Sequence, residues 1–288
     1  SSAAWTGESD QASALYGRGI STAGDVNGDG YSDVVVGAYR YDNGEMDEGR
    51  AYLYLGSASG LSTTAAWTGE SDQVSAQYGI SVSTAGDVNG DGYSDVVVGA
   101  FYYSNGESSE GRAYLYLGSA SGLSPTASWK GESNQANAIY GQSLSTAGDV
   151  NGDGYSDVVV GAGSYSNGES IEGRAYLYLG SSSGLSTIAS WMGESNQAFA
   201  YYGRSVSTAG DVNGDGYSDV VVGVDGYSNG ESGEGRAYLY LGTASGLSTT
   251  ASWTGESDQA SASYGLTVST AGDVNGDGYS DVVVSASY

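Results

Sequence analysis

The chain has 288 residues, of which 39% are hydrophobic, so it is long enough to bury one large core or two small ones. Its formal charge of -26, from 34 acidic and 8 basic residues, excludes nucleic acid and anionic membranes as partners and favours cations. Cysteine and histidine are both absent, which excludes disulfides, zinc-thiolate sites, thiol catalysis and the commonest acid–base side chain.

One nine-residue string organises the whole sequence. Asp-Val-Asn-Gly-Asp-Gly-Tyr-Ser-Asp begins at Asp25, Asp87, Asp149, Asp211 and Asp273, and each copy starts 62 residues after the one before. A tryptophan, a Tyr-Gly pair and the string Gly-Arg-Ala-Tyr-Leu-Tyr-Leu-Gly recur with the same step. We therefore expect a single repeat array over residues 1–288, without a linker or a second domain.

Each repeat has the composition of short β-strands separated by turns. In chain order, the first repeat predicts strands over residues 16–22, 33–38, 50–55 and 65–69. In the third of these, aliphatic residues alternate with arginine and tyrosine, so both faces of the sheet are expected to be packed. The pattern predicts an all-β β-propeller of four-stranded antiparallel blades, with five repeats of which the last is incomplete. A stack of sandwiches or a linear β-solenoid is the less favoured alternative.

The loop between the first two strands of each repeat carries the strongest chemical signal. In the first copy, Asp25, Asn27, Asp29 and Asp33 place oxygen side chains at positions 1, 3, 5 and 9, and Tyr31 offers a main-chain carbonyl at position 7. Such hard oxygen ligands, completed by water or by bidentate binding of one carboxylate, reach the roughly six to eight ligands that calcium takes. The corresponding ligands of the other copies are Asp87, Asn89, Asp91, Tyr93, Asp95, Asp149, Asn151, Asp153, Tyr155, Asp157, Asp211, Asn213, Asp215, Tyr217, Asp219, Asp273, Asn275, Asp277, Tyr279 and Asp281.

An EF-hand and a simple turn are the two alternatives to this calcium loop. An EF-hand needs a bidentate acid at position 12 and flanking helices, but position 12 is Val36, inside a valine run that predicts a strand. A simple turn explains one copy of Asp, Asn and Gly, yet three carboxylates within nine positions repel one another unless a cation neutralises them. The sequence therefore predicts about five calcium ions, one per repeat.

The Tyr-Gly pair, the nine-residue string and the Val-Val-Val-Gly-Ala segment together resemble the FG-GAP repeat. This is the blade of the integrin α-subunit propeller, and the bacterial extracellular versions are the most similar. Tyr16 and its copies replace the family's usual phenylalanine, and the proline that commonly follows Gly-Ala is missing, as at Tyr39 and Phe101. The resemblance covers essentially the full chain. It implies a calcium-stabilised propeller, usually seven-bladed, that serves adhesion or ligand binding outside the cell or at its surface.

The two ends of the sequence break the repeat. Tyr288 corresponds to Arg40, so the fifth copy lacks the counterpart of residues 41–62, which include the third strand. Residues 1–7 match the fourth strand and are expected to close the ring while leaving the last blade one strand short. The remedy is a longer chain, an inward shift of the fourth strand, or a strand from another subunit that covers the edge at residues 282–284. Self-association or an additional chain is thus an expected partner.

A few positions vary between otherwise similar copies and are candidates for a ligand-binding rim. They are Arg40, Met46, Asp47, Phe101, Tyr102, Ile171, Val224 and Asp225. Neutral drift in exposed loops is the alternative.

Glu45, Glu48 and Arg50 are interpreted as a solvated hairpin with a surface ion pair. The repeated tryptophans are expected to pack between blades rather than to stack on sugars.

Three functions fit these features. The first is a non-enzymatic, extracellular or cell-surface calcium-binding propeller for adhesion or for recognition of a protein or glycan. The second is a structural subunit of a fibre or other assembly completed by strand exchange. The third is a non-catalytic propeller domain of a larger secreted protein or enzyme.

Catalysis is not expected, because no pair of acids stands outside the repeat pattern. No apolar run approaches the roughly 20 residues of a membrane helix, so membrane insertion is not expected.

Overall fold

The computed structural model describes residues 3–287, and within them the chain forms eighteen strands in five antiparallel sheets. The first sheet contains β1 (Tyr16–Gly24), β2 (Asp33–Ala38), β3 (Arg50–Tyr54) and β4 (Trp67–Glu70). The second contains β5 (Tyr78–Gly86), β6 (Asp95–Ala100), β7 (Arg112–Tyr116) and β8 (Trp129–Glu132). The third contains β9 (Ser143–Gly148), β10 (Asp157–Ala162), β11 (Arg174–Tyr178) and β12 (Trp191–Glu194).

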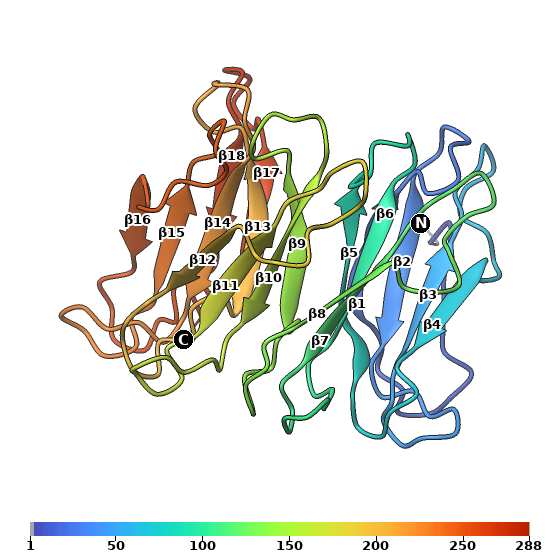
Figure 1. The fold of residues 1–288 in the computed structure, drawn as a ribbon, viewed down its shortest axis with the longest axis horizontal. Coiled ribbons are helices and arrows are strands. Elements are labelled where there is room, and N and C mark those ends of the chain that lie inside the picture. The colour runs from blue at the N-terminus through green and yellow to red at the C-terminus, as the bar shows by residue number, and fades with distance from the viewer. Residues whose placement is uncertain (1–2, 288) are drawn as a thin grey trace.

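The fourth sheet repeats this order, and the fifth stops short of it. The fourth contains β13 (Ser205–Gly210), β14 (Asp219–Val224), β15 (Arg236–Tyr240) and β16 (Trp253–Glu256). The fifth has only β17 (Val268–Gly272) and β18 (Asp281–Val284). Figure 1 shows the sheets following one another in chain order, from blue to red. The predicted β-propeller of four-stranded blades, with an incomplete last repeat, is confirmed.

The strand boundaries agree closely with the predicted ones. The second strand begins and ends as predicted, while β1 continues two residues further to Gly24. This continuation contains a register irregularity between Thr22 and Gly24, which keeps the chain paired with β2 up to Asp33. The third strand ends one residue early, at Tyr54, and the fourth starts at Trp67, after the turn that follows β3.

The first strand of each blade lies beside the first strand of the next, so these strands line the centre of the molecule. Packing there is close enough to require glycine. A Cβ on Gly37 would lie 1.8 Å from the carbonyl oxygen of Gly79, at the start of β5. A Cβ on Gly161 would lie at the same distance from the carbonyl oxygen of Gly203. The Val-Val-Val-Gly-Ala segment therefore serves the approach of neighbouring backbones.

The hydrophobic core lies between blades rather than within them. Val35 and Leu53 of the first blade form one buried cluster with Val96 and Val98 of the second. Trp67 lies at the edge of the same cluster. Its ring meets Tyr116 of the second blade edge-on, at a centroid distance of 4.7 Å. The prediction that the repeated tryptophans pack between blades is confirmed for Trp67, Trp129 and Trp191.

The expectation that residues 1–7 form a closing strand is wrong for the part that the structure describes, while residues 1 and 2 lie outside it. Residues 3–7 contain no strand. Instead, Trp5 packs edge-on against Tyr54, at 5.0 Å, and its Nε1 donates a hydrogen bond to the carbonyl oxygen of Ser62. Trp67 makes the same two contacts with the second blade, through Tyr116 and Ser124. The N-terminal segment is thus held by its tryptophan, because the edge to which it would pair lacks a third strand.

None of the elements within residues 3–287 is a helix, and so none is a helix suited to crossing a membrane.

Candidate cation loops and axial cavity

The nine-residue loop between β1 and β2 curls around the carboxylate of Asp25. One oxygen of this carboxylate accepts hydrogen bonds from the backbone N–H groups of Gly28, at 2.7 Å, and Asp29, at 3.1 Å. The other accepts from Gly30 N–H at 2.8 Å. Gly28 and Gly30 have φ angles of 72° and 88°, which glycine adopts without strain. Burial raises the pKa of Asp25, but these amide hydrogen bonds outweigh it and lower the pKa below its ordinary value.

The next two predicted ligands lie inside the same turn. Asn27 Oδ1 accepts a hydrogen bond from Asp29 N–H at 3.1 Å, and its Nδ2 donates to Asp29 Oδ2 at 3.0 Å. Asp29 Oδ1 in turn accepts from Tyr31 N–H at 3.0 Å. The four other loops repeat these bonds at the equivalent positions. The loop therefore brings Asn27 and Asp29 together beside Asp25 in a compact turn, but the carboxylate oxygens of its three aspartates do not all lie within 4.8 Å of one another.

The last predicted ligand, Asp33, is fully buried, unlike the other predicted ligands of the first loop. Its Oδ2 accepts from Val26 N–H at 2.9 Å and its Oδ1 from Gly56 N–H at 2.7 Å, so it joins the loop to the turn after β3. Burial raises the pKa of Asp33, and the nearby charges of Asp25 and Asp29 add to the effect. In the second and third blades, burial raises the pKa of Asp95 and Asp157 to about 7.

The donor set of each loop suits calcium: three carboxylates, one amide oxygen and one main-chain carbonyl are all hard ligands. A cation among them would also offset the repulsion from Asp25 and Asp29, which adds to the effect of burial on the pKa of Asp33. In the structure, each of the first four loops joins neighbouring blades as well. The carbonyl oxygens of Asp25 and Val26 accept hydrogen bonds from Ser94 N–H, at 2.9 Å, and Ser119 N–H, at 3.0 Å, in the second blade. An ion held by the loop would therefore stabilise an interface between blades.

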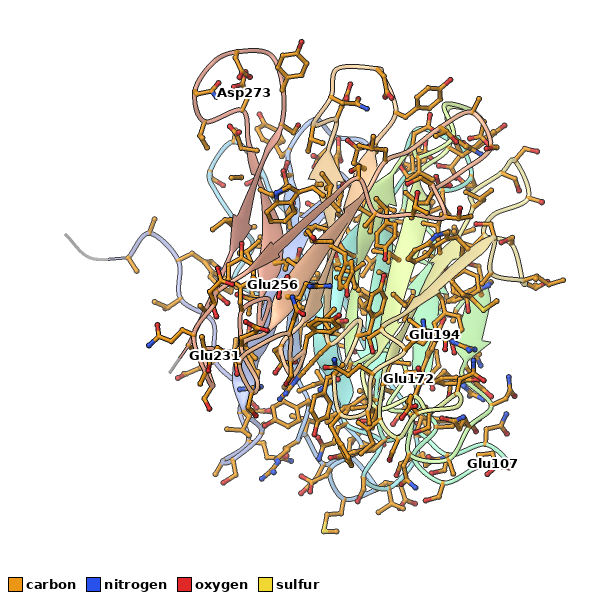
Figure 2. The ribbon with its side chains drawn as sticks, turned by 90° about the vertical axis from the view of Figure 1, so that its left-hand side faces the viewer. Glu107, Glu172, Glu194, Glu231, Glu256 and Asp273 are labelled. Atoms are coloured by element: carbon orange, nitrogen blue, oxygen red, sulfur yellow. The ribbon has the colours of Figure 1, made fainter. Side chains whose placement is uncertain are left out.

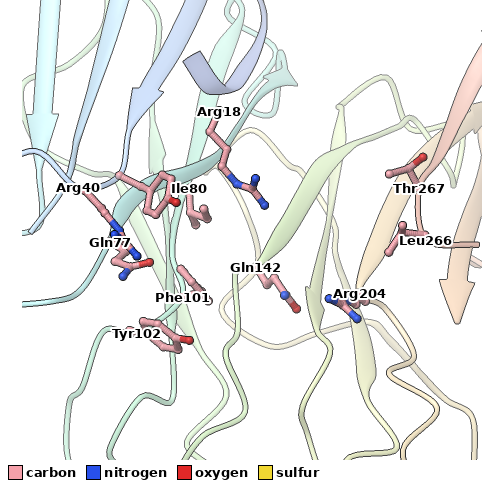
Figure 3. A pocket seen from close by; sticks show the side chains of 11 residues that line it. Arg18, Arg40, Gln77, Ile80, Phe101, Tyr102, Gln142, Arg204, Leu266 and Thr267 are labelled. Atoms are coloured by element: carbon pink, nitrogen blue, oxygen red, sulfur yellow. The ribbon is translucent and has the colours of Figure 1, made fainter. Parts of the chain in front are cut away.

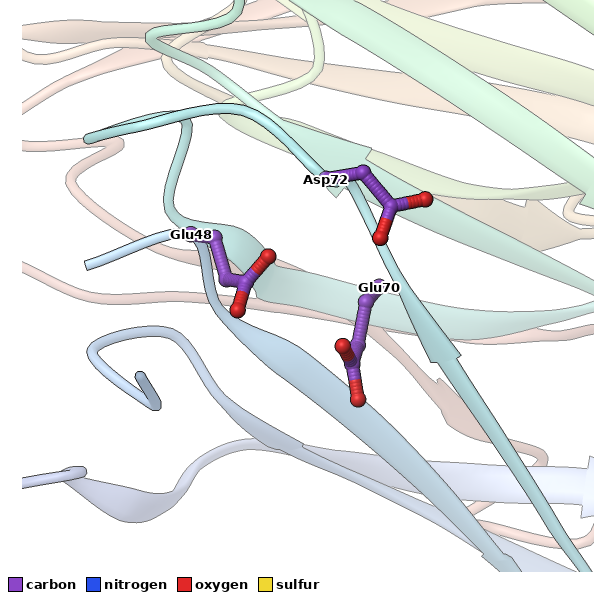
Figure 4. A group of neighbouring side chains, drawn as sticks. All are labelled: Glu48, Glu70 and Asp72. Atoms are coloured by element: carbon purple, nitrogen blue, oxygen red, sulfur yellow. The ribbon is translucent and has the colours of Figure 1, made fainter. Parts of the chain in front are cut away.

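A different acidic cluster was missed by the sequence analysis. Glu48, Glu70 and Asp72 turn their carboxylates toward one another (Figure 4). Among residues 3–287 they are the only group of three acidic side chains with oxygens within 4.8 Å of one another. The predicted surface ion pair is wrong, because Arg50 pairs with Glu70 on the adjacent strand instead. Only pairing of β3 with β4 brings these residues together, which the residue order does not reveal.

Glu48 is buried rather than solvated as predicted. Its Oε1 accepts a hydrogen bond from Asn43 N–H at 2.5 Å, which holds the loop before β3, while its Oε2 has no partner. Burial raises the pKa of Glu48, and the charges of Glu70 and Asp72 raise it further. The equivalent glutamates of the next three blades are buried in the same way: Glu110, Glu172 and Glu234. This residue organises the loop between the second and third strands of each blade.

A cavity of about 640 Å³ lies at the centre of the molecule, between the first strands of the blades (Figure 3). We call it the axial cavity. Its lining includes the residue that follows each Tyr-Gly pair, one from every repeat: Arg18, Ile80, Gln142, Arg204 and Leu266. The other lining residues are Tyr39, Arg40, Gln77, Phe101, Tyr102 and Thr267. Residues of five repeats thus converge on one space.

The predicted variable positions divide between this cavity and other places. Arg40, Phe101 and Tyr102 line the cavity. Val224 is fully buried at the end of β14 and belongs to the core, so it is not a surface position. Asp225 is also buried and pairs with Arg204 at 2.8 Å. The remaining three, Met46, Asp47 and Ile171, are not among the lining residues.

The axial cavity and the nine-residue loops belong to opposite ends of the blades. The cavity residues stand at the start of the first strand or just after the second, whereas the loops join the other ends of these two antiparallel strands. Figure 2 shows the two ends of the blades, with Asp273 of the fifth nine-residue loop at the top and Glu107, in the loop after β6, at the bottom. A cation in a loop is therefore far from the cavity and would not be part of a site there.

The sequence is similar to known proteins over most of its length. The FG-GAP-like repeat family matches residues 25–98, 87–160, 149–222 and 211–284. Integrin alpha-V of Gallus gallus is 34% identical over 212 residues, which are 70% of this chain and 19% of that protein. Integrin alpha-IIb of Mus musculus is 36% identical over 162 residues, 53% of this chain and 15% of that protein.

A third similar protein is integrin alpha-4 of Xenopus laevis, 34% identical over 144 residues, which are 49% of this chain and 14% of that protein. In each comparison, the matched part of the chain spans less than a fifth of the relative's length.

Proposed function

Because the chain belongs to the FG-GAP-like repeat family, we propose that it is a calcium-stabilised propeller that recognises a protein or glycan outside the cell or at its surface. The similarity to integrin alpha subunits supports an adhesion or recognition role. The convergence of five residues of four different types, one after each Tyr-Gly pair, on the axial cavity carries this proposal. In a chain whose repeats are otherwise nearly constant, these positions are free to serve a ligand rather than the fold.

Calcium has a stabilising role in this proposal and takes part in no reaction. Each ion would be held by the two outer aspartates, the central Asp and Asn, and the tyrosine carbonyl of one loop. Because the unfolded chain has no such site, the free energy of binding adds to the free energy of folding. A free calcium concentration 100 times the dissociation constant adds about 2.7 kcal/mol per site.

The proposed role is recognition without catalysis. Hydrolysis of a glycosidic bond needs two carboxyl groups with separated pKa values that face one substrate. The residues that line the axial cavity include arginine, glutamine and aromatic side chains but neither aspartate nor glutamate. Such a lining suits binding by charge and by ring contacts.

Thermal unfolding tests the calcium part of the proposal. The melting temperature should be higher in excess calcium than in excess chelator, and magnesium should restore less of the difference because it prefers to keep its own water ligands. Asp29→Ala should remove part of the calcium response and leave the rest, since four other loops remain. A melting temperature that is the same in calcium and in chelator would contradict this part.

Recognition is tested with a panel of purified extracellular matrix proteins and glycans, immobilised and probed with the chain in calcium. Tyr102→Ala removes an aromatic side chain that lines the cavity, and Met46→Ala removes an exposed apolar side chain outside its lining. We expect the first variant to lose binding to any ligand found and the second to retain it. Equal binding by both variants would remove the cavity from the proposal.

An assembly subunit is the second candidate, favoured by exposed apolar residues on the terminal blades. Ile20 in β1 is 60% exposed and Val283 in β18 is 55% exposed, whereas Val82 and Val221, at the corresponding places in inner blades, are buried. Another chain, or a further part of a larger secreted protein, would cover such surfaces. Measuring the mass in solution with and without chelator separates the two candidates, because an assembly gives a multiple of 29.1 kDa.

A further inference from the structure

The arginines are divided into two groups with different surroundings. One arginine of each complete blade pairs with a glutamate of the neighbouring strand, namely Arg50, Arg112, Arg174 and Arg236. The three that do not belong to the repeat pattern are Arg18, Arg40 and Arg204, and all three line the axial cavity. The chain has a formal charge of -26, yet all three arginines that do not belong to the repeat pattern surround one cavity.

Two of these arginines have no acidic partner within the described part of the chain. Arg204 pairs with Asp225, but neither Arg18 nor Arg40 has a carboxylate of residues 3–287 within ion-pair distance. The guanidinium of Arg40 lies 5.7 Å from the centre of the Tyr39 ring. The lining itself adds no negative charge. The cavity is therefore positively charged although the protein is strongly acidic.

The remaining lining residues offer groups that match a peptide. Gln142 lines the cavity and its buried Oε1 has no hydrogen-bond partner, so a ligand N–H directed at this oxygen would satisfy it. Figure 3 shows Arg18, Gln142 and Arg204 directed into the same space from different blades. Phe101 and Tyr102 stack on each other at a centroid distance of 4.0 Å and present aromatic surface. Cation, acceptor and aromatic surface thus face one cavity.

We propose that the axial cavity binds an acidic peptide segment of a partner protein. Arg18 and Arg40 attract its carboxylate, Gln142 accepts a hydrogen bond from a peptide N–H, and an adjacent apolar side chain packs on Phe101 and Tyr102. An extended polyanion fits less well, because the rest of the acidic surface repels it, whereas one carboxylate meets only the cavity. The inference rests on the proposed recognition function and gives the ligand its chemistry.

The carboxylate has two possible sources, an acidic side chain or the end of a chain, and three peptides distinguish them. The first is Leu-Asp-Leu, acetylated and amidated; the second is the same peptide with Asn in place of Asp; the third is acetylated Leu-Leu-Leu with a free carboxyl end. Binding is measured by NMR titration of the isotopically labelled chain in calcium. We expect the Asp peptide or the free-acid peptide to bind about tenfold more tightly than the Asn peptide.

Variants test the residues named. Arg18→Gln and Arg40→Gln should each weaken binding of the charged peptide by about tenfold, and should leave the Asn peptide unaffected. Lys130→Gln is the matched control, since it removes one positive charge from an exposed position on β8, outside the cavity lining. The melting temperatures of all three variants should equal that of the unmodified chain, which separates binding from folding.

Three results would overturn the inference: equal binding of all three peptides, binding of the charged peptide that survives both arginine substitutions, or tighter binding of a uronic-acid oligosaccharide than of any peptide. The recognition function is tested separately from the chemistry of the ligand. If Tyr102→Ala loses binding to a ligand of the panel while charged peptides show no preference, only the assignment of an acidic ligand fails. If no cavity variant affects any ligand, the recognition function itself fails.

Discussion

The interface between the third and fourth blades is complete, whereas the one between the fourth blade and the fifth sheet is only partly formed. Trp191 of the third blade is 8% exposed and contacts Tyr240 edge-on at 4.8 Å. Trp253, its counterpart in the fourth blade, is 42% exposed. The sequences around the two tryptophans are nearly the same, so the difference comes from the neighbour: the fifth sheet has no third strand to supply the tyrosine.

The same contrast holds for the nine-residue loops. Val150, in the third loop, is fully buried, and its carbonyl oxygen accepts a hydrogen bond from Thr243 N–H of the fourth blade at 3.0 Å. Val274, in the identical fifth loop, is 72% exposed. A repeat of this kind therefore does not bury its own apolar side chains, because the following blade does so. Stability is carried by the interfaces, which makes matched variants at inner and terminal positions informative.

The largest difference is expected between the two tryptophans. Trp191→Ala should lower the free energy of unfolding by about 3–5 kcal/mol, because it empties a buried site and leaves the carbonyl oxygen of Ser248 without its donor. Trp253→Ala should cost about 1 kcal/mol, since much of its ring already faces water. Urea unfolding in calcium, followed by circular dichroism, measures both. Equal losses would mean that Trp253 is buried in solution by another segment or another chain that packs against the fifth sheet.

A second pair compares a glycine with the serine that replaces it. Gly161 has no room for a side chain, because a Cβ would lie 1.8 Å from the Gly203 oxygen of the next blade. At the corresponding place in the fifth repeat stands Ser285, whose hydroxyl oxygen accepts a hydrogen bond from Thr267 N–H at 2.9 Å. We expect Gly161→Ser to destabilise the chain by about 3 kcal/mol and Ser285→Gly by less than about 1 kcal/mol. Urea unfolding measures both variants. An unchanged free energy of unfolding for Gly161→Ser would contradict the close backbone packing.

Sequence reasoning succeeded where the repeat itself holds the information. The boundaries of β2, the antiparallel four-stranded order and the packing role of the tryptophans follow from alternation, turn residues and the constant step. The loop oxygens were found in the same way, and their role as calcium ligands stays a prediction.

What the sequence did not reveal depends on contacts between distant segments. The pairing of Arg50 with Glu70 and the burial of Glu48 require β3 and β4 to be adjacent. The docking of Trp5 required knowledge of the first blade's surface. The axial cavity was only partly visible: Arg40 and Tyr102 were noted as variable, but Arg18 and its equivalents were overlooked, because their shared exposure to one space is a property of the ring. Comparing the residue after each Tyr-Gly pair would have found them.

The smallest expected effect is the pH dependence of the loops, and it again separates an inner loop from the terminal one. Burial raises the pKa of Asp157 to about 7, well above its ordinary value of 3.8, so folding favours its protonated form. In excess chelator, ionisation then opposes folding: the melting temperature should fall as the pH rises from about 4 to 7, and should level off above 7. Asp157→Asn should reduce this slope without abolishing it, because Asp95 contributes in the same direction.

Asp281→Asn is the matched control for that experiment. Asp281 is partly exposed and accepts from Val274 N–H at 2.9 Å, but the fifth repeat contains no residue equivalent to Gly180, whose N–H binds Asp157. Comparison of the two variants therefore separates a buried loop carboxylate from a partly exposed one. In calcium the slope of the unmodified chain should reverse, because the ion binds only ionised carboxylates and a proton then competes with it. A melting temperature that rises between pH 4 and 7 in chelator would show that the fold stabilises Asp157 as a carboxylate without any cation. The electrostatic argument for calcium in the inner loops would then fail.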